Sequence, residues 1–141
     1  MRIVVDASVA LKWYVPEIHS EAATRVLDAR RSGVRLHVPD LFYPEFGNIL
    51  SKKARVGEIS NTVAAEIADA MLGVPKTVHA SEALLPAALE IALDSGRTVY
   101  DSLYLALAAF LGCEAVTADE RLYRGLANTR WSALLRWVED V

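Results

Sequence analysis

The sequence lacks the cysteines for a disulfide and any apolar run long enough to cross a membrane. Cys113 is the only cysteine among 141 residues, and its apolar surroundings indicate a small core residue. The longest uncharged apolar run, residues 103–113, is well short of the ~20 residues that a membrane helix needs. Asp6 ends the apolar start before the ~7–15 apolar residues of a signal peptide are complete. We therefore expect a cytoplasmic protein without a membrane segment.

The sequence does contain enough apolar residues to build a core without a disulfide or a metal. Hydrophobic residues make up 53% of the chain. A domain of this length buries roughly two-thirds of the surface that its unfolded chain exposes. Residues 1–141 are therefore expected to form a single domain.

An excess of basic residues is also missing. The chain carries 15 Lys and Arg against 18 Asp and Glu, a net charge of −3, which argues against a nonspecific nucleic-acid binder. Basic residues cluster locally at Arg30, Arg31 and Arg35, at Lys52, Lys53 and Arg55, and at Arg121 and Arg124. Each cluster fits either a solvated helix face or a surface that follows an RNA backbone.

Short strand-like runs alternate along the chain with longer helical ones. Strands are expected at residues 2–5, 34–38, 77–79, 114–117 and 134–138, and helices at 7–15, 19–31, 41–55, 60–72, 81–94, 99–111 and 119–127. This order predicts a three-layer α/β/α sandwich with a mainly parallel, roughly five-stranded sheet. In such sheets, ligands bind beyond the carboxyl ends of the strands.

Two carboxylates follow predicted strands directly. Asp6 comes after the first strand and Asp119 after the strand that ends at residue 117, so both should lie at the same edge of the sheet. Each has a second explanation, because a helix is expected to begin at the next residues and an aspartate can cap it.

Two further carboxylates lie in strongly apolar helices. Asp101 begins the apolar helix of TVYDSLYLALAAF, where an acid in the first turn also suits the helix dipole. Glu45 lies beside the buried stripe of LFYPEFGNILSKKA, where a salt bridge is the alternative explanation. A buried carboxylate without a partner is costly, so both residues call for a cation or a hydrogen-bond donor.

These four acids are far apart in sequence, and only a fold can bring them together. If they converge, their mutual repulsion raises their pKa values unless a cation lies among them. Oxygen ligands without Cys or His suit Mg²⁺ or Mn²⁺ rather than zinc. The three histidines, His19, His37 and His79, are scattered without metal-type spacing and are expected to be structural.

Four stretches together resemble the PIN-domain ribonucleases, and more narrowly the VapC-type toxins of toxin–antitoxin pairs. They are IVVDASVAL, VPDLFYPEFGNIL, TVYDSLYLALA and AVTADERL, in the order and at the approximate spacing of that family. The resemblance spans essentially the whole chain and implies a PIN-like fold. By position, the acidic quartet of the family falls on Asp6, Glu45, Asp101 and Asp119. Its polar neighbours fall on Ser8, Thr117 and Asn48.

The resemblance implies an Mg²⁺-dependent endoribonuclease, with Mn²⁺ as a possible substitute. Asp6, Asp101 and Asp119 would bind the metal, and Glu45 would hold a metal-bound water or act as base. Ser8, Thr117 and Asn48 would orient these side chains from outside the metal shell, although the first two also fit ordinary cap or turn hydroxyls.

The resemblance also implies partners and leaves rival functions open. VapC-type proteins usually form homodimers and bind an antitoxin in a groove, for which candidates here are Trp13, Tyr14, Phe42 and Tyr43, although Trp13 and Phe42 also fit a core. A non-catalytic PIN-like module that binds RNA or a partner is the alternative function. A phosphotransferase of the haloacid-dehalogenase type is disfavoured, since Ser8 occupies the place of its second aspartate.

Overall fold

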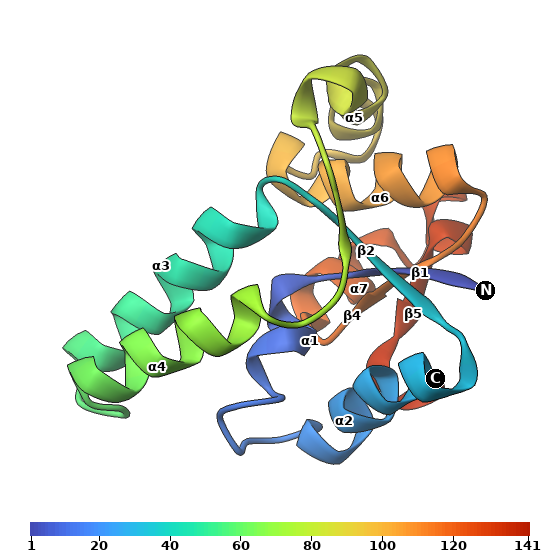
Figure 1. The fold of residues 1–141 in the computed structure, drawn as a ribbon. Coiled ribbons are helices and arrows are strands. Elements are labelled where there is room, and N and C mark those ends of the chain that lie inside the picture. Colours follow the sequence, from blue (N-terminus) through green and yellow to red (C-terminus); the bar gives the residue numbers. More distant parts are fainter.

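The chain folds into a three-layer α/β/α sandwich around one five-stranded sheet (Figure 1). The computed structural model describes all residues, Met1–Val141. The strands are β1 (Arg2–Val5), β2 (Arg35–Pro39), β3 (Thr77–His79), β4 (Ala115–Thr117) and β5 (Leu135–Trp137). They are arranged in the order β3-β2-β1-β4-β5, and every neighbouring pair is parallel. The predicted fold class is confirmed.

The first strand lies in the middle of this sheet. Ile3 pairs with Leu36 of β2 on one side, and Val5 pairs with Val116 of β4 on the other. Since β1 and β4 are parallel neighbours, their carboxyl ends meet at one edge. The residues that follow these two strands therefore start close together.

Helices cover both faces of the sheet. Four lie on one face: α1 (Ala7–Leu11), α2 (Ser20–Asp28), α3 (Phe42–Arg55) and α4 (Asn61–Leu72). The other face carries α5 (Ser81–Ser95), α6 (Val99–Leu111) and α7 (Glu120–Leu126). Short 3₁₀ helices occupy Ala29–Ser32, Arg130–Leu134 and Val138–Asp140. No helix combines the length and the apolar character that a membrane crossing requires.

Two helices end differently from the sequence-based expectation. The helix expected at residues 7–15 stops at Leu11, because the next amides bond to the carbonyl three residues back, as in Trp13 N–H to Ala10 O. The helix expected at residues 19–31 begins only after His19, which has a left-handed backbone with φ 68°. Its last turn tightens into the 3₁₀ helix Ala29–Ser32.

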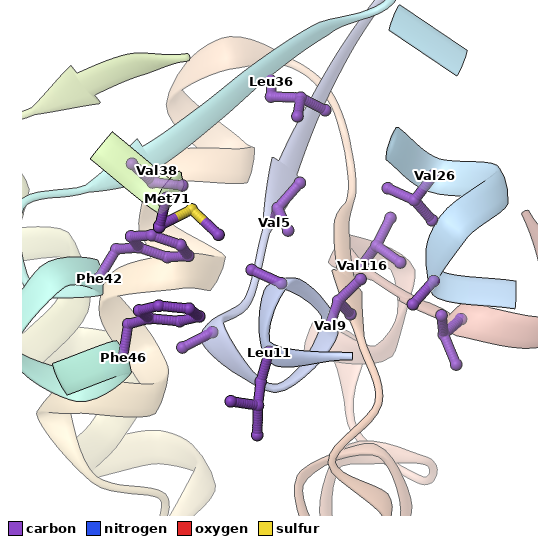
Figure 2. Close-up of a cluster of buried hydrophobic side chains, with 14 of the residues drawn as sticks. Val5, Val9, Leu11, Val26, Leu36, Val38, Phe42, Phe46, Met71 and Val116 are labelled. Atoms are coloured by element: carbon purple, nitrogen blue, oxygen red, sulfur yellow. The ribbon is translucent and has the colours of Figure 1, made fainter. Parts of the chain in front are cut away.

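Alternation along the strands divides the core into two clusters. Ile3 and Val5 point into the cluster under α1–α4, while Val4 joins the cluster under α5–α7. In the first cluster, Phe42 and Phe46 stack with ring centroids 5.7 Å apart (Figure 2). Each fully buried side chain of this size stabilises the fold by roughly 1.5–3 kcal/mol. This packing fixes α3 against the sheet and so fixes where Glu45, which precedes Phe46, can lie.

Candidate active site

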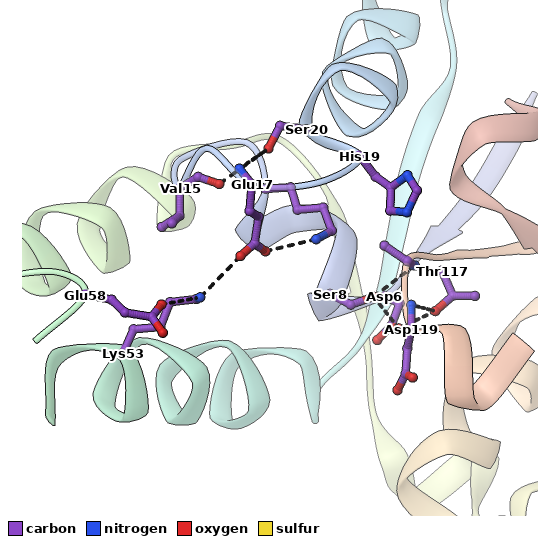
Figure 3. Close-up of polar contacts among 12 residues, drawn as sticks. Asp6, Ser8, Val15, Glu17, His19, Ser20, Lys53, Glu58, Thr117 and Asp119 are labelled. Carbon is purple, nitrogen blue, oxygen red and sulfur yellow. Dashed lines mark hydrogen bonds and ion pairs between the residues drawn. The ribbon is translucent and has the colours of Figure 1, made fainter. Parts of the chain in front are cut away.

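Asp6 is buried at the carboxyl end of β1 and is held by two hydroxyl groups. Ser8 Oγ and Thr117 Oγ1 each donate a hydrogen bond of 2.8 Å to Asp6 Oδ2 (Figure 3). Asp6 occupies the N-cap position of α1, yet its side chain makes no capping hydrogen bond. The helix-cap explanation is therefore wrong for Asp6, whose carboxylate is turned toward β4 instead.

The two hydroxyl groups also fix the connection that follows β4. Ser8 Oγ accepts the backbone N–H of Ala118 at 3.1 Å, and Thr117 Oγ1 accepts that of Asp119 at 3.0 Å. Each hydroxyl thus donates to the carboxylate and accepts from the main chain, which leaves it one orientation. Ser8 and Thr117 orient Asp6, and both hydrogen bonds reach the same oxygen.

Asp119 follows β4 and caps α7. Its Oδ1 accepts the backbone N–H groups of Arg121 at 3.0 Å and Leu122 at 3.3 Å. The capping explanation is therefore correct for Asp119. Because the cap uses Oδ1, the other oxygen of Asp119 stays available to a ligand in the space beyond the strands.

Asp101 lies half-buried in the first turn of α6. The cap of this helix is Thr98, whose hydroxyl accepts the backbone N–H of Asp101 at 3.0 Å. The Asp101 carboxylate belongs to none of the ion pairs in the structure. Burial raises the pKa of Asp101, the charge of Asp119 raises it further, and the nearby Arg97 and Arg121 act in the opposite direction.

Glu45 reaches the same edge from α3 and meets a buried tyrosine. Tyr104 Oη donates a hydrogen bond of 2.5 Å to Glu45 Oε2. Burial raises the pKa of Glu45 to about 7, with the Tyr104 hydrogen bond opposing the shift and the charges of Asp6, Asp101 and Asp119 adding to it. The alternative of a buried salt bridge is wrong, since no basic side chain pairs with Glu45.

Tyr104 is the functional neighbour that the sequence analysis did not single out. It is fully buried, one helical turn after Asp101 on α6. Burial raises the pKa of its hydroxyl far above the usual range, so Tyr104 stays protonated and acts only as a donor to Glu45. Its spacing of three residues from Asp101 was the signal that could have identified it.

The structure brings three of the four predicted acids into one pocket. Glu45, Asp101 and Asp119 line a pocket of about 450 Å³ together with Arg97 and Arg121, and we call this space the acidic pocket. Asp6 is not among the lining residues, but its charge acts on Glu45. Burial raises the pKa of Asp6 in spite of its two hydroxyl donors, and the charges of Asp119 and Asp101 raise it further. The charges of the four residues therefore interact electrostatically across the end of the sheet.

The donor chemistry of the acidic pocket suits a hard divalent cation. Its candidate ligands are carboxylates alone, and burial, with a smaller contribution from the neighbouring acids, raises the pKa values of Asp6, Glu45 and Asp101. In the arrangement seen here, no three Asp, Glu, His or Cys side chains are close enough to hold one ion. The residues fit Mg²⁺ by chemistry, and binding an ion requires the carboxylates to draw closer.

Other residues singled out from the sequence lie away from the acidic pocket. Asn48 is exposed on α3 and does not line the pocket, because that part of the helix turns Phe46 and Leu50 to the core. Phe42 is a core residue, and Trp13 packs against the core while its Nε1 donates to Ala23 O at 2.7 Å. The core explanation is therefore correct for Phe42, whereas Trp13 is a partly buried residue at the margin of the core.

The histidines make polar contacts elsewhere in the structure and do not line the acidic pocket. His19 Nδ1 lies 2.6 Å from Glu139 Oε1, and His37 Nδ1 lies 2.9 Å from His79 Nε2 across β2 and β3. None of the three is part of a metal-binding group. The prediction that they are structural agrees with these contacts.

Comparisons with known proteins give this arrangement its context. The PIN domain family matches residues 3–125. Ribonuclease VapC3 of Pyrobaculum aerophilum is 37% identical over 124 residues, which cover 86% of this chain and 92% of that protein. The crystal structure of PAE2754 from the same organism superimposes with a TM-score of 0.71 at 26% identity, covering 99% of this chain and 85% of that one.

More distant structures share the fold. VapC20 of Mycobacterium tuberculosis, described as a sarcin–ricin loop cleaving toxin, has a TM-score of 0.65 at 17% identity and covers 85% of this chain and 92% of its own. VapBC2 of Rickettsia felis, solved with a DNA fragment from its promoter, has a TM-score of 0.66 at 10% identity and covers 97% of this chain and 98% of its own. Since the PIN match spans most of the sequence and a VapC ribonuclease is more than one-third identical over that span, the chain belongs to the PIN domain family and is a homologue of the VapC ribonucleases.

Proposed function

We propose that this protein is an Mg²⁺-dependent endoribonuclease, the toxin of a type II toxin–antitoxin system, that hydrolyses RNA phosphodiesters in the cytoplasm. The observation that carries the proposal is a group of four carboxylates at the carboxyl edge of the sheet, none of which forms an ion pair and three of which line one pocket. An α/β domain has no structural need for such a group, because uncompensated like charges destabilise it. Homology to a VapC ribonuclease supports the choice of RNA as substrate.

Three of the carboxylates are the proposed metal ligands. Asp6 and Asp119 follow the ends of the neighbouring strands β1 and β4, and Asp101, in the first turn of α6, lines the same pocket as Asp119. Asp6 Oδ2 is occupied by two hydroxyl donors and Asp119 Oδ1 by the helix cap. We infer that Asp6 Oδ1 and Asp119 Oδ2 are the ligating oxygens. A bound Mg²⁺, or Mn²⁺ in its place, would lower the pKa of a water and offset charge on the phosphate.

Glu45 is the proposed general base. Without a bound cation its pKa is about 7, and burial, the largest cause of that shift, favours a base that takes a proton near neutral pH. Tyr104 holds Oε2, which leaves Oε1 to accept the proton of the attacking water. The water oxygen then bonds to phosphorus, the bond from phosphorus to the leaving ribose oxygen breaks, and that oxygen takes a proton from solvent. Tyr104 positions the base throughout without changing its own protonation.

Cleavage of labelled RNA tests the activity. We expect cleavage with Mg²⁺ or Mn²⁺, none with EDTA, and recovery when Mg²⁺ is restored. Asp69→Asn is the control variant, because Asp69 is exposed on α4 and makes no side-chain contact. RNA binding without metal-dependent cleavage on any RNA offered would favour the alternative function, a non-catalytic PIN-like module that binds RNA or a partner.

A homodimer and a cognate antitoxin are the proposed protein partners. Leu85, Leu89 and Leu93 are exposed at four-residue spacing along α5, which forms an apolar stripe on the outer side of its layer. A stripe of this kind on two copies is self-complementary about a two-fold axis. Light scattering after gel filtration should give twice the chain mass, and the double variant L89E/L93E should give the monomer mass. A wild-type monomer would contradict this proposal without touching the enzymatic one.

A further inference from the structure

Arg97 lies in the short connection between α5 and α6, and its backbone is fixed on both sides. Gly96 ends α5 in the left-handed region with φ 74°. Ser95 Oγ accepts the backbone N–H of Arg97 at 3.2 Å, and Thr98 then caps α6. The side chain of Arg97 therefore leaves a rigid point at the wall of the acidic pocket.

The guanidinium of Arg97 rests against the backbone of α7 at Gly125. A Cβ atom at residue 125 would lie 2.8 Å from Arg97 Cζ, 2.9 Å from Nη1 and 3.2 Å from Nε. Real Cβ atoms do not approach other atoms so closely, so any residue larger than glycine would displace this group. Gly125 is not in a left-handed conformation, and the room it leaves for Arg97 is the physical reason for a glycine in this helix.

Arg97 forms no ion pair although three carboxylates line the same pocket. Five other arginines do form ion pairs, such as Arg130 with Asp94 at 3.3 Å. Its Nε is buried and makes no hydrogen bond. A held but unpaired guanidinium is prepared for an anion that is not part of this chain.

We propose that Arg97 binds a non-bridging oxygen pair of an RNA backbone phosphate at the acidic pocket, and that Gly125 exists to seat its guanidinium there. This inference rests on the proposed function, in which RNA enters this pocket. The planar guanidinium matches phosphate through two parallel hydrogen bonds, which a lysine cannot reproduce. Because the connection and Gly125 already fix the side chain, little ordering remains to be done when the phosphate binds.

Binding of a fluorescently labelled single-stranded RNA to the full-length protein tests the proposal, measured by anisotropy in EDTA so that no metal-dependent cleavage occurs. Arg97→Gln should weaken binding about tenfold, since it removes a charge-assisted contact. The slope of log K against log salt should become shallower by about 0.7, the loss of one phosphate contact on a single strand. Arg97→Lys should restore the slope but not the affinity.

The matched control is Arg2→Gln. Arg2 is exposed at the first residue of β1, at the opposite end of the sheet, and forms no ion pair. The control removes one positive charge from the protein without changing the acidic pocket. Equal losses of affinity for Arg97→Gln and Arg2→Gln would show a general charge effect and overturn the proposal, as would no loss for Arg97→Gln.

Gly125→Ala tests the position of the guanidinium alone, because it moves the Arg97 side chain without removing its charge. Alanine favours a helix over glycine, so the thermal midpoint should not fall, yet RNA binding should weaken because the new Cβ displaces Arg97. In the Arg97→Gln background the same change should cost no further affinity. An equal loss in both backgrounds would show that Gly125 does not act through Arg97.

These outcomes are distinct from failure of the proposed function. With Mg²⁺ present, Arg97→Gln should raise KM about tenfold with a smaller change in kcat, since the contact is made in substrate and transition state alike. A protein that binds RNA through Arg97 in EDTA but never cleaves would sink the nuclease proposal and keep this one. A wild-type protein that binds no RNA would overturn both.

Discussion

Two groups of charged side chains differ in how their charges are matched, and Figure 3 shows the first group together with Asp6 and Asp119 of the second. In the first group, Glu17 lies between two lysines, 2.9 Å from Lys12 and 3.3 Å from Lys53, and Lys53 also reaches Glu58 at 2.9 Å. Burial alone would raise the pKa of Glu17, but the two lysines bring it below its usual value. Every charge of this ion-pair network is matched within the chain.

The acids at the carboxyl edge of the sheet are not matched. Asp6, Glu45 and Asp101 all have raised pKa values, and none pairs with a lysine or arginine. Burial acts to raise the pKa of Glu17 as well as those of Asp6, Glu45 and Asp101, so the compensating charges distinguish the two groups. The difference is that the carboxylates of the ion-pair network pair with lysines, while no carboxylate of the acidic pocket forms an ion pair. Perturbed carboxylates of the second kind are typical of functional sites.

The largest expected effect comes from removing one of the unmatched charges. Asp101→Asn should reduce RNA cleavage to background, because it deletes a proposed metal ligand, and Asp6→Asn should do the same. In EDTA both variants should melt at or above the wild-type temperature, since repulsion is relieved. Mg²⁺ should raise the melting temperature of the wild type but not of Asp101→Asn. Wild-type cleavage rates in either variant would show that residue to be wrongly assigned.

Glu45→Gln should lower the cleavage rate by about 10²–10⁴-fold, the usual contribution of a general base. It also has a pH signature. The folded pKa of Glu45 is raised from 4.5 to about 7, so the unfolded chain loses this proton first as pH rises through that window. The wild type therefore loses stability relative to Glu45→Gln between these values and keeps the full deficit above them.

Thermal unfolding of both proteins in EDTA, from about pH 4 to about pH 8, measures this difference. The melting temperatures should agree at the acid end apart from a constant offset, and diverge in favour of Glu45→Gln toward the alkaline end. A difference that stays constant across the whole range would mean that Glu45 titrates normally.

A smaller effect is expected from Thr117→Val, which keeps the shape but removes the hydroxyl between Asp6 and Asp119. Losing such an orienting group costs about 10–100-fold in metal affinity or activity, so the Mg²⁺ concentration for half-maximal cleavage should rise by that factor. Thr24→Val is the control, because its hydroxyl bonds only to the Ser20 carbonyl of α2. A shift of the same size in the control would remove Thr117 from the site.

The smallest effect is expected in the matched group. Lys53→Met breaks two ion pairs in which the lysine side chain is 15% exposed and the carboxylates are 29% and 56% exposed. Exposed pairs are worth about 0.2–1 kcal/mol each at low salt and less as salt rises, so the loss should lie in the upper part of that range. Denaturant unfolding at two salt concentrations measures that loss, while RNA cleavage should not change. A fall in cleavage as large as that of Thr117→Val would place Lys53 on the RNA path and weaken the contrast between the two groups.

The strands could be predicted from the sequence, and so could the edge of the sheet at which two of the acids lie. Alternating strands and helices predicted the sheet, and Asp6 and Asp119 were expected at the ends of neighbouring strands. Their local signals were the same, since each precedes a helix, yet only Asp119 caps its helix. The partner that turns Asp6 away is Thr117, which lies 111 residues along the chain. Local patterns cannot contain a contact of that separation.

Other parts of the site could not be predicted from local sequence patterns for the same reason. The approach of Glu45 to the other acids depends on how α3 packs, and the Tyr104 hydrogen bond joins α6 to α3 across 59 residues. The seat of Arg97 against Gly125 depends on the contact between α7 and the α5–α6 connection. The resemblance to the PIN-domain family predicted that the acids converge, whereas the contacts of the residues around them could be found only from the structure.

The strand order also determines when the site can exist during synthesis. β1 lies beside β4, whose first residue is Ala115, and Asp119 comes later still. Ribosomes release the N-terminal part first, so a nascent chain carries Asp6 and Glu45 long before Thr117 and Asp119 emerge. A polypeptide stalled or truncated before residue 117 has neither the hydroxyl that orients Asp6 nor the last carboxylate. The acidic pocket can therefore form only after the chain has been synthesised beyond Asp119.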